Sequence, residues 1–254
     1  MRARGGGRGR TRRWRRPNEG LTALDQFLRW LDLAGIAVFA ASGALVASRK
    51  QMDAVGFVVV AAVTGLGGGT LRDLLLGRTP VLWLRAPEPL AVCAAAALLV
   101  FFTAHLVESR FRALLWADAM GLALFAVSGA ELALISGADP WAAALLGVVS
   151  ACFGGIVRDV MCGEVPLILR REIYLTAAGA GAAAFVLLRL AGGAGRDAAV
   201  TAGVAVAFGI RGAALLRGWS LPAYRARPGR DYPDPSGTAP PRLSDAGGAP
   251  DGGA

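Results

Sequence analysis

Two seven-residue motifs hold the residues of this chain that could do chemistry. Each places glycines about one helical turn before an arginine and an aspartate, near the end of a long apolar segment. Glycines let a helix kink or break and let a second backbone approach closely. A charged pair at membrane depth normally faces water or a partner, so it could line an ion path. The candidates are Gly67, Gly68, Gly69, Arg72 and Asp73 in the first motif and Gly154, Gly155, Arg158 and Asp159 in the second.

These charges admit two interpretations. In the first, two broken helices face each other across a polar path, and the charges and any carbonyls freed by the break line it. In the second, the charged side chains lie near helix ends, extend to the lipid headgroups and pair locally, which is a structural role. The symmetry of the two motifs favours the first interpretation.

The motifs belong to an internal duplication with a constant offset. The arginines are 158 − 72 = 86 residues apart, and the prolines that follow keep the same offset, 166 − 80 = 86. Matches at Gly, Asp, Phe and Ser in one frame without a gap are hard to obtain by chance, so the chain contains a repeat. Its small-residue patches are suited to close helix packing. The matched pairs include Asp32/Asp118, Gly35/Gly121, Phe39/Phe125, Ser42/Ser128, Gly43/Gly129 and Asp53/Asp139.

Long apolar helices must position these motifs. The chain of 254 residues is 55% hydrophobic, with a mean hydropathy of +0.50. A helix needs about 20 mostly apolar residues to cross a bilayer, and seven segments of about that length are present. A soluble protein would have to bury seven helices with almost no amphipathic faces, so we predict an all-α membrane protein. The predicted spans are residues 31–48, 54–76, 88–107, 117–135, 140–162, 173–190 and 197–216.

The duplication decides the predicted architecture. Three spans precede the second copy, and an odd number of spans reverses the direction of the chain. The sequence therefore predicts two inverted three-helix repeats, residues 31–107 and 117–190, with a seventh helix at 197–216 that closes the bundle. The Arg/Gly-rich residues 1–30 and the Pro/Gly-rich residues 222–254 are predicted to be disordered tails. Much of the net charge of +9 lies in these flanks, where contact with anionic lipid is expected rather than with nucleic acid.

Residue content argues against an enzyme. His105 is the only histidine, and Cys93, Cys152 and Cys162 lie in predicted spans without a CxxC pair. The chain also lacks a phosphate-binding loop and a dinucleotide fingerprint that follows a strand. We therefore expect no catalytic site, no metal site and no cofactor.

The two motifs, each followed by glycine and proline among three plus three plus one spans, resemble the prokaryotic trimeric intracellular cation channel family. Its domain is also catalogued as a glycine transporter domain. The resemblance covers residues 31 to about 216 and implies a homotrimer in the cell membrane. It implies a pore in each protomer, shaped by glycine kinks in the second and fifth helices, that passes monovalent cations such as K⁺ and Na⁺, chiefly K⁺. Phe153 stands where the first copy has Gly67, so the second kink should be milder.

The resemblance also implies an external N-terminus and a cytoplasmic C-terminus. The loop charges agree with the positive-inside rule, although the Arg-rich segment before Trp30 argues for the reverse. The basic residues that would lie inside are Arg49, Lys50, Arg110, Arg112, Arg170, Arg171 and those of the segment 217–230.

Two functions remain open from the residues: a passive cation channel, and a secondary transporter of a small amino acid such as glycine. Inverted repeats with broken helices suit both. The segments after the glycines contain few hydroxyl and amide side chains that could build a tight substrate pocket, which favours the channel. A structural or assembly role in the membrane is a third class.

Overall fold

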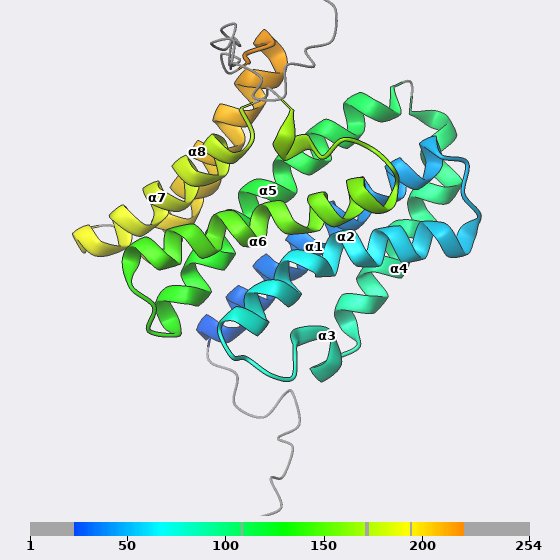
Figure 1. The fold of residues 1–254 in the computed structure, drawn as a ribbon. Coiled ribbons are helices and arrows are strands. Elements are labelled where there is room, and N and C mark those ends of the chain that lie inside the picture. Colours follow the sequence, from blue (N-terminus) through cyan, green and yellow to red (C-terminus); the bar gives the residue numbers. More distant parts are fainter. Residues whose placement is uncertain (1–22, 108, 171–172, 194, 221–254) are drawn as a thin grey trace, which may run out of the picture. The chain divides into compact units, whose positions relative to one another are not determined.

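Long helices make up almost all of the described chain. The computed structural model describes residues 23–220 except 108, 171, 172 and 194, and these residues belong to one unit (Figure 1). The predicted tail at 222–254 and most of the one at 1–30 lie outside the described residues. The α-helices are α1 (Ala23–Arg49), α2 (Ala54–Leu75), α3 (Leu82–Arg85), α4 (Glu88–Thr103), α5 (Arg110–Ile135), α6 (Pro140–Met161), α7 (Leu175–Ala191) and α8 (Arg196–Arg217), and the 3-10 turns are η1 (Ala104–Leu106) and η2 (Leu167–Leu169).

The seven predicted spans correspond to seven of these helices. Six of them among the described residues are long and apolar enough to cross a membrane. The remaining one, α7, has 17 residues, which at about 1.5 Å per residue lies at the short end of the range for a span. The short α3 and η2 form the connections that follow α2 and α6. The fold class predicted from the sequence is confirmed.

Two helices begin earlier than predicted. α1 starts at Ala23, inside the segment predicted as a tail up to residue 30, and α5 starts at Arg110 rather than at 117. Hydropathy locates the apolar part of a helix and misses a charged first turn. The first turn of α5 is capped by Ser109, whose side chain accepts from the Arg112 amide, and Arg29 in the extension of α1 pairs with Glu88.

The repeat found in the sequence is a repeat of helices. Shifting α2 by 86 residues gives 54 + 86 = 140 and 75 + 86 = 161, which are the bounds of α6. The same shift places α1 on α5 and α4 on α7 to within two residues. α8 has no counterpart in the first repeat and packs against α5 and α7 of the second.

Contacts across the centre show that the repeats are inverted. A methyl group placed on Gly35 would lie 2.9 Å from the Phe125 ring, and one placed on Gly121 would lie 2.7 Å from the Phe39 ring. The two rings stack with centroids 5.4 Å apart. Gly35 therefore contacts the repeat equivalent of Phe39, and Phe39 contacts the repeat equivalent of Gly35. Such reciprocal contacts are the signature of a two-fold axis. Because the earlier residue of α1 meets the later residue of α5, the two helices are antiparallel.

Candidate functional site

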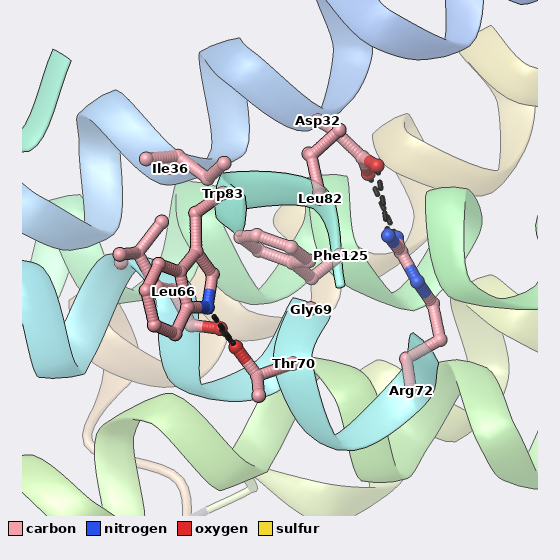
Figure 2. Close-up of a pocket in the computed structure, with 10 residues that line it drawn as sticks. Asp32, Ile36, Leu66, Gly69, Thr70, Arg72, Leu82, Trp83 and Phe125 are labelled. Atoms are coloured by element: carbon pink, nitrogen blue, oxygen red, sulfur yellow. Dashed lines mark hydrogen bonds and ion pairs between the residues drawn. The ribbon is translucent and has the colours of Figure 1, made fainter. Parts of the chain in front are cut away.

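The first motif builds a buried ion cluster in the first repeat. Arg72, in the last turn of α2, donates from both terminal nitrogens to the carboxylate of Asp32 on α1, at 2.8 and 2.9 Å (Figure 2). It also donates to Oδ1 of Asp73 at 3.2 and 3.1 Å. The second oxygen of Asp73 accepts from the Leu82 amide at 3.1 Å, so the pair also holds the start of α3. The Arg72 side chain is 2% exposed. We name Asp32, Arg72 and Asp73 the first cluster.

The second motif builds the same cluster in the second repeat. Arg158 donates to Asp118 on α5 at 2.8 Å and to Asp159 at 2.8 Å. Asp159 accepts from the Leu167 amide at 2.9 Å and so holds η2. The arginine and its partner on the preceding long helix are 40 residues apart in both repeats, since 72 − 32 = 40 and 158 − 118 = 40. We name Asp118, Arg158 and Asp159 the second cluster.

One contact joins the second cluster to the other repeat. Arg158 donates to the hydroxyl of Ser42 at 2.9 Å, and Ser42 donates to the Phe39 carbonyl at 2.8 Å. The equivalent hydroxyl of Ser128 is buried and has no hydrogen-bond partner among the described residues. Ser42 therefore does more than allow close packing, since it is part of the polar network of the second cluster.

Each cluster holds two carboxylates around one guanidinium. With all three groups ionised, its formal charge is −2 + 1 = −1. Charges in a low-dielectric interior are stable only when they are closely paired. Arg72 meets Asp32 in a bidentate pair. Arg158 instead makes one hydrogen bond to each of Asp118 and Asp159. Both arginines lie in the last turns of α2 and α6, and their side chains are buried and pair locally. A negative surplus at two buried sites favours cations over anions.

The space beside the first cluster is small. The cavity shown in Figure 2 has a volume of about 10 Å³ and is lined by Asp32, Arg72 and largely apolar side chains of α1, α2 and α5. A cavity needs at least about 10–15 Å³ to hold one water molecule. Trp83 closes one side and donates to the hydroxyl of Thr70 at 3.1 Å. This site has room for about one water molecule and not for an amino acid.

The motif glycines bring α2 and α6 into backbone contact. A methyl group on Gly68 would lie 2.1 Å from the Ser150 carbonyl oxygen, and one on Gly154 would lie 2.3 Å from that of Thr64. Since 64 + 86 = 150 and 68 + 86 = 154, these two contacts are again reciprocal about the two-fold axis. Both helices run unbroken through their glycines. A break is therefore absent at these glycines, and a kink stays a prediction. The close approach of two backbones explains why Gly68 and Gly154 lack side chains.

The other motif glycines meet less crowded surroundings. A methyl group on Gly67 would be 3.4 Å from Gly154 Cα and one on Gly69 would be 3.8 Å from the Arg72 guanidinium. A methyl group on Gly155 would lie 3.2 Å from the Tyr174 hydroxyl. Gly67 borders an apolar groove of about 480 Å³ whose floor is α2, and Phe153 and Val157 of α6 form one of its walls.

The small-residue patches pack helices within each repeat. A methyl group on Gly43 would lie 2.6 Å from the Thr64 hydroxyl on α2, and one on Gly129 would lie 2.9 Å from Ser150 Cβ on α6. These contacts join α1 to α2 and α5 to α6. The sequence left open whether the patches act within or between protomers, and the structure shows the contacts within one.

Several polar residues of the site were not singled out from the sequence. Asp32 and Asp118 appeared there only as a matched pair, yet each is the main partner of a buried arginine. Their match in the repeat was a usable signal, because a carboxylate retained twice within an apolar segment calls for a partner. Glu131 is also buried and pairs with Arg196 on α8 at 2.6 Å. The repeat gives no signal for it, because the equivalent residue is Leu45.

Comparisons with known proteins agree with this geometry. The family model described as glycine transporter matches residues 29–105 and 115–190, one match for each repeat. A UPF0126 membrane protein of Vibrio cholerae is 42% identical over 213 residues, which covers 80% of this chain and 85% of that protein. The UPF0126 inner membrane protein YadS of Escherichia coli is 43% identical over 152 residues, covering 58% and 72%.

Solved structures show the same fold. The trimeric intracellular cation (TRIC) channel orthologue from Rhodobacter sphaeroides is 56% identical, with a TM-score of 0.74, and covers 76% of this chain and 100% of that one. A structure described as the basis for conductance through TRIC cation channels is 34% identical, with a TM-score of 0.70, and covers 78% and 98%. The chain therefore belongs to the TRIC/UPF0126 family of membrane proteins, whose family model is described as glycine transporter.

Proposed function

We propose that this protein is a membrane channel for monovalent cations, chiefly K⁺, with a pore in each protomer of a homotrimer. The observation that carries the proposal is the likeness to the Rhodobacter sphaeroides TRIC channel orthologue, at 56% identity over that chain's whole length. The clusters add a physical reason. Two buried sites of formal charge −1, one in each inverted repeat, attract cations and repel anions.

The candidate pore residues are those of the two motifs. Gly68 and Gly154 set how closely α2 and α6 approach, and the paired charges fix the ends of these helices. The arginines would raise the barrier for a cation if they stood alone, and their carboxylates remove that barrier. We therefore expect a cation to pass along the carboxylate side of each cluster.

The second candidate is a transporter of glycine, which the description of the family model suggests. A zwitterion needs a site for its carboxylate and one for its ammonium group, in a cavity that holds both. The cavity at the first cluster has room for about one water molecule, and the larger groove is lined almost entirely by apolar groups. The channel is therefore the better fit.

The arrangement of basic residues supports the predicted orientation. Arg49 and Arg170 lie on the ring of Phe111, at 5.0 and 5.8 Å from its centroid, and Glu164 pairs with Arg49 at 3.3 Å. Basic residues from α1, α5 and the segment after α6 thus gather at one end of the bundle. By the positive-inside rule we propose that this end is cytoplasmic. Reporter fusions at the two termini test this, and a cytoplasmic N-terminus would overturn it.

One experiment separates the two functions. The purified protein is reconstituted into liposomes, and K⁺ flux and uptake of labelled glycine are measured on the same preparation, with empty liposomes as the control. A channel gives K⁺ flux that follows the membrane potential and no glycine accumulation. Glycine accumulation against its gradient, without K⁺ flux, would overturn the proposal.

A further inference from the structure

The two ion clusters are built alike but are not equally accessible. In the first cluster the Asp32 side chain is 11% exposed and borders the cavity of Figure 2. In the second cluster both Asp118 and Arg158 are 0% exposed. A two-fold axis would make the two sites equal, so residues that differ between the repeats, or the unmatched α8, must cover the second cluster.

Tyr174 is one part of that cover. It directly precedes α7 and is buried, with 2% of its surface exposed. A methyl group on Gly155 would lie 3.2 Å from the Tyr174 hydroxyl and 3.4 Å from Asp118 Oδ1, so both groups converge on the same glycine of α6. The equivalent position in the first repeat, 174 − 86 = 88, is Glu88, whose side chain is 45% exposed and pairs with Arg29. Tyr174 thus covers the second cluster, and the first repeat has no tyrosine at the equivalent position.

Arg211 is the other part. It lies on α8, the helix without a counterpart, and is 1% exposed. Its guanidinium lies over the Tyr174 ring at 5.2 Å from the centroid and donates to the Ile173 carbonyl at 3.4 Å. A cation held on an aromatic face in this way is stabilised by the ring. Arg211 therefore fixes the ring whose hydroxyl lies beside Asp118.

Arg211 also changes the local charge. Arg211 adds a positive charge over the Tyr174 ring, beside a second cluster whose own three groups carry a formal charge of −2 + 1 = −1. The first cluster keeps its formal charge of −1. α8 thus places an arginine beside one cluster only, and the two clusters differ in their surrounding charge and in their exposure.

We propose that Tyr174 and Arg211 form a seal that keeps water and cations away from the second cluster and so controls passage at that end of the protein. The part of the proposal that concerns passage rests on the proposed cation channel. In the conformation described here the first cluster is the more exposed of the two and the second is closed. Displacement of the ring or withdrawal of α8 would open the second cluster.

Native cysteines report on the seal without reference to ion flux. Cys152 on α6 is 3% exposed and lies about one helical turn before Gly155, the glycine on which Tyr174 and Asp118 converge. Cys93 lies in the first half, with its sulfur 3.1 Å from a methyl group built on Gly65. The protein in liposomes is treated with a small water-soluble methanethiosulfonate, and labelling of each cysteine is followed by peptide mass spectrometry. Cys93 is the internal reference.

The variants are Tyr174→Ala, which removes the ring, and Tyr174→Phe, which keeps it. We expect the labelling rate of Cys152 to rise at least about tenfold in Tyr174→Ala and to stay low in Tyr174→Phe. The labelling rate of Cys93 should be the same in both variants and in the original protein. K⁺ flux should rise together with the labelling of Cys152. If Tyr174→Ala does not fold, Arg211→Leu serves instead, because it releases the ring and removes the positive charge that lies over it.

The possible outcomes separate the two proposals. Protection of Cys152 in a folded Tyr174→Ala or Arg211→Leu protein would overturn the seal, whatever the flux. Labelling of Cys152 with a parallel rise in flux supports both the seal and the channel. If Cys152 is labelled in the variants but no form of the protein passes K⁺, the result supports a seal against water and contradicts the proposed channel.

Discussion

A single methyl group tests whether the motif glycines serve backbone contact or flexibility. In Gly68→Ala the new Cβ lies 2.1 Å from the Ser150 carbonyl oxygen, whereas ordinary contacts begin at 3.4 Å, so α2 and α6 must separate by about 3.4 − 2.1 = 1.3 Å. In Gly69→Ala the nearest atom is the Arg72 guanidinium at 3.8 Å, and nothing has to move. The two variants change the same helix by the same atom, one position apart.

The expected energies follow from two opposed effects. Each substitution gains about 1 kcal/mol because alanine favours a helix interior over glycine. Overpacking of a tight contact costs about 1–3 kcal/mol, and only Gly68→Ala meets it. The variants should therefore differ in the free energy of unfolding by about 1–3 kcal/mol, with Gly69→Ala the more stable. At about 2–4 °C per kcal/mol for a chain of this size, the melting temperatures should differ by about 2–12 °C.

Thermal unfolding in mild detergent, followed by size-exclusion chromatography of the protein that remains folded, measures this difference. The reciprocal variant Gly154→Ala should behave like Gly68→Ala, because its methyl group would lie 2.3 Å from the Thr64 carbonyl oxygen. If the glycines acted only through flexibility, neighbouring positions would respond alike. A melting temperature of Gly68→Ala equal to or above that of Gly69→Ala would refute the contact argument.

Other perturbations address the charges and the assembly. Asp118→Asn leaves a fully buried arginine with one carboxylate and should lower the free energy of unfolding by about 3–5 kcal/mol in denaturant titrations. Asp32→Asn also leaves one carboxylate but should lower it less, because Asp32 is partly exposed and Asp118 is not. An equal loss in both variants would contradict the difference in burial. Glu164→Gln removes a partly exposed ion pair with Arg49 and should change the free energy of unfolding by less than about 1 kcal/mol. A larger drop would contradict the small contribution expected of an exposed pair. Chemical crosslinking in mild detergent should stop at a trimer, and a ladder that ended at a dimer would contradict the proposed assembly.

The sequence predicted the elements better than their contacts. Hydropathy located seven spans, and the 86-residue offset predicted inverted repeats, because both are properties of the local pattern and of the number of crossings. The pairing of Arg72 with Asp32 could not be read in this way, since the two residues are 40 positions apart and meet only when α1 packs on α2. The sequence did pair Asp32 with Asp118 through the repeat, but a matched residue carries no information about which cation it faces.

The asymmetric features were the least predictable. Tyr174 and Glu88 occupy the same position of the repeat, so the comparison of the two copies showed only a mismatch. Arg211 lies on α8, for which the duplication offers no reference. The glycines were expected to allow a kink, a break or a close backbone approach, but a run of glycines in one helix does not reveal which carbonyl of another helix approaches it.

The reciprocal contacts of α2 with α6 have a consequence for how such a protein can arise. Each contact about the axis joins equivalent surfaces, as in a symmetric dimer, so one unduplicated repeat already carries both sides of the interface. Two such units could pair only if half of them entered the membrane upside down. Two copies of such a three-helix unit can be fused in one chain, either directly or through an even number of added membrane crossings. The fusion would preserve the inverted arrangement, and single units would no longer have to insert in both orientations. α8, which packs against α5 and α7 of the second repeat, gives the protein a distinction between its two halves that a dimer of identical units cannot have.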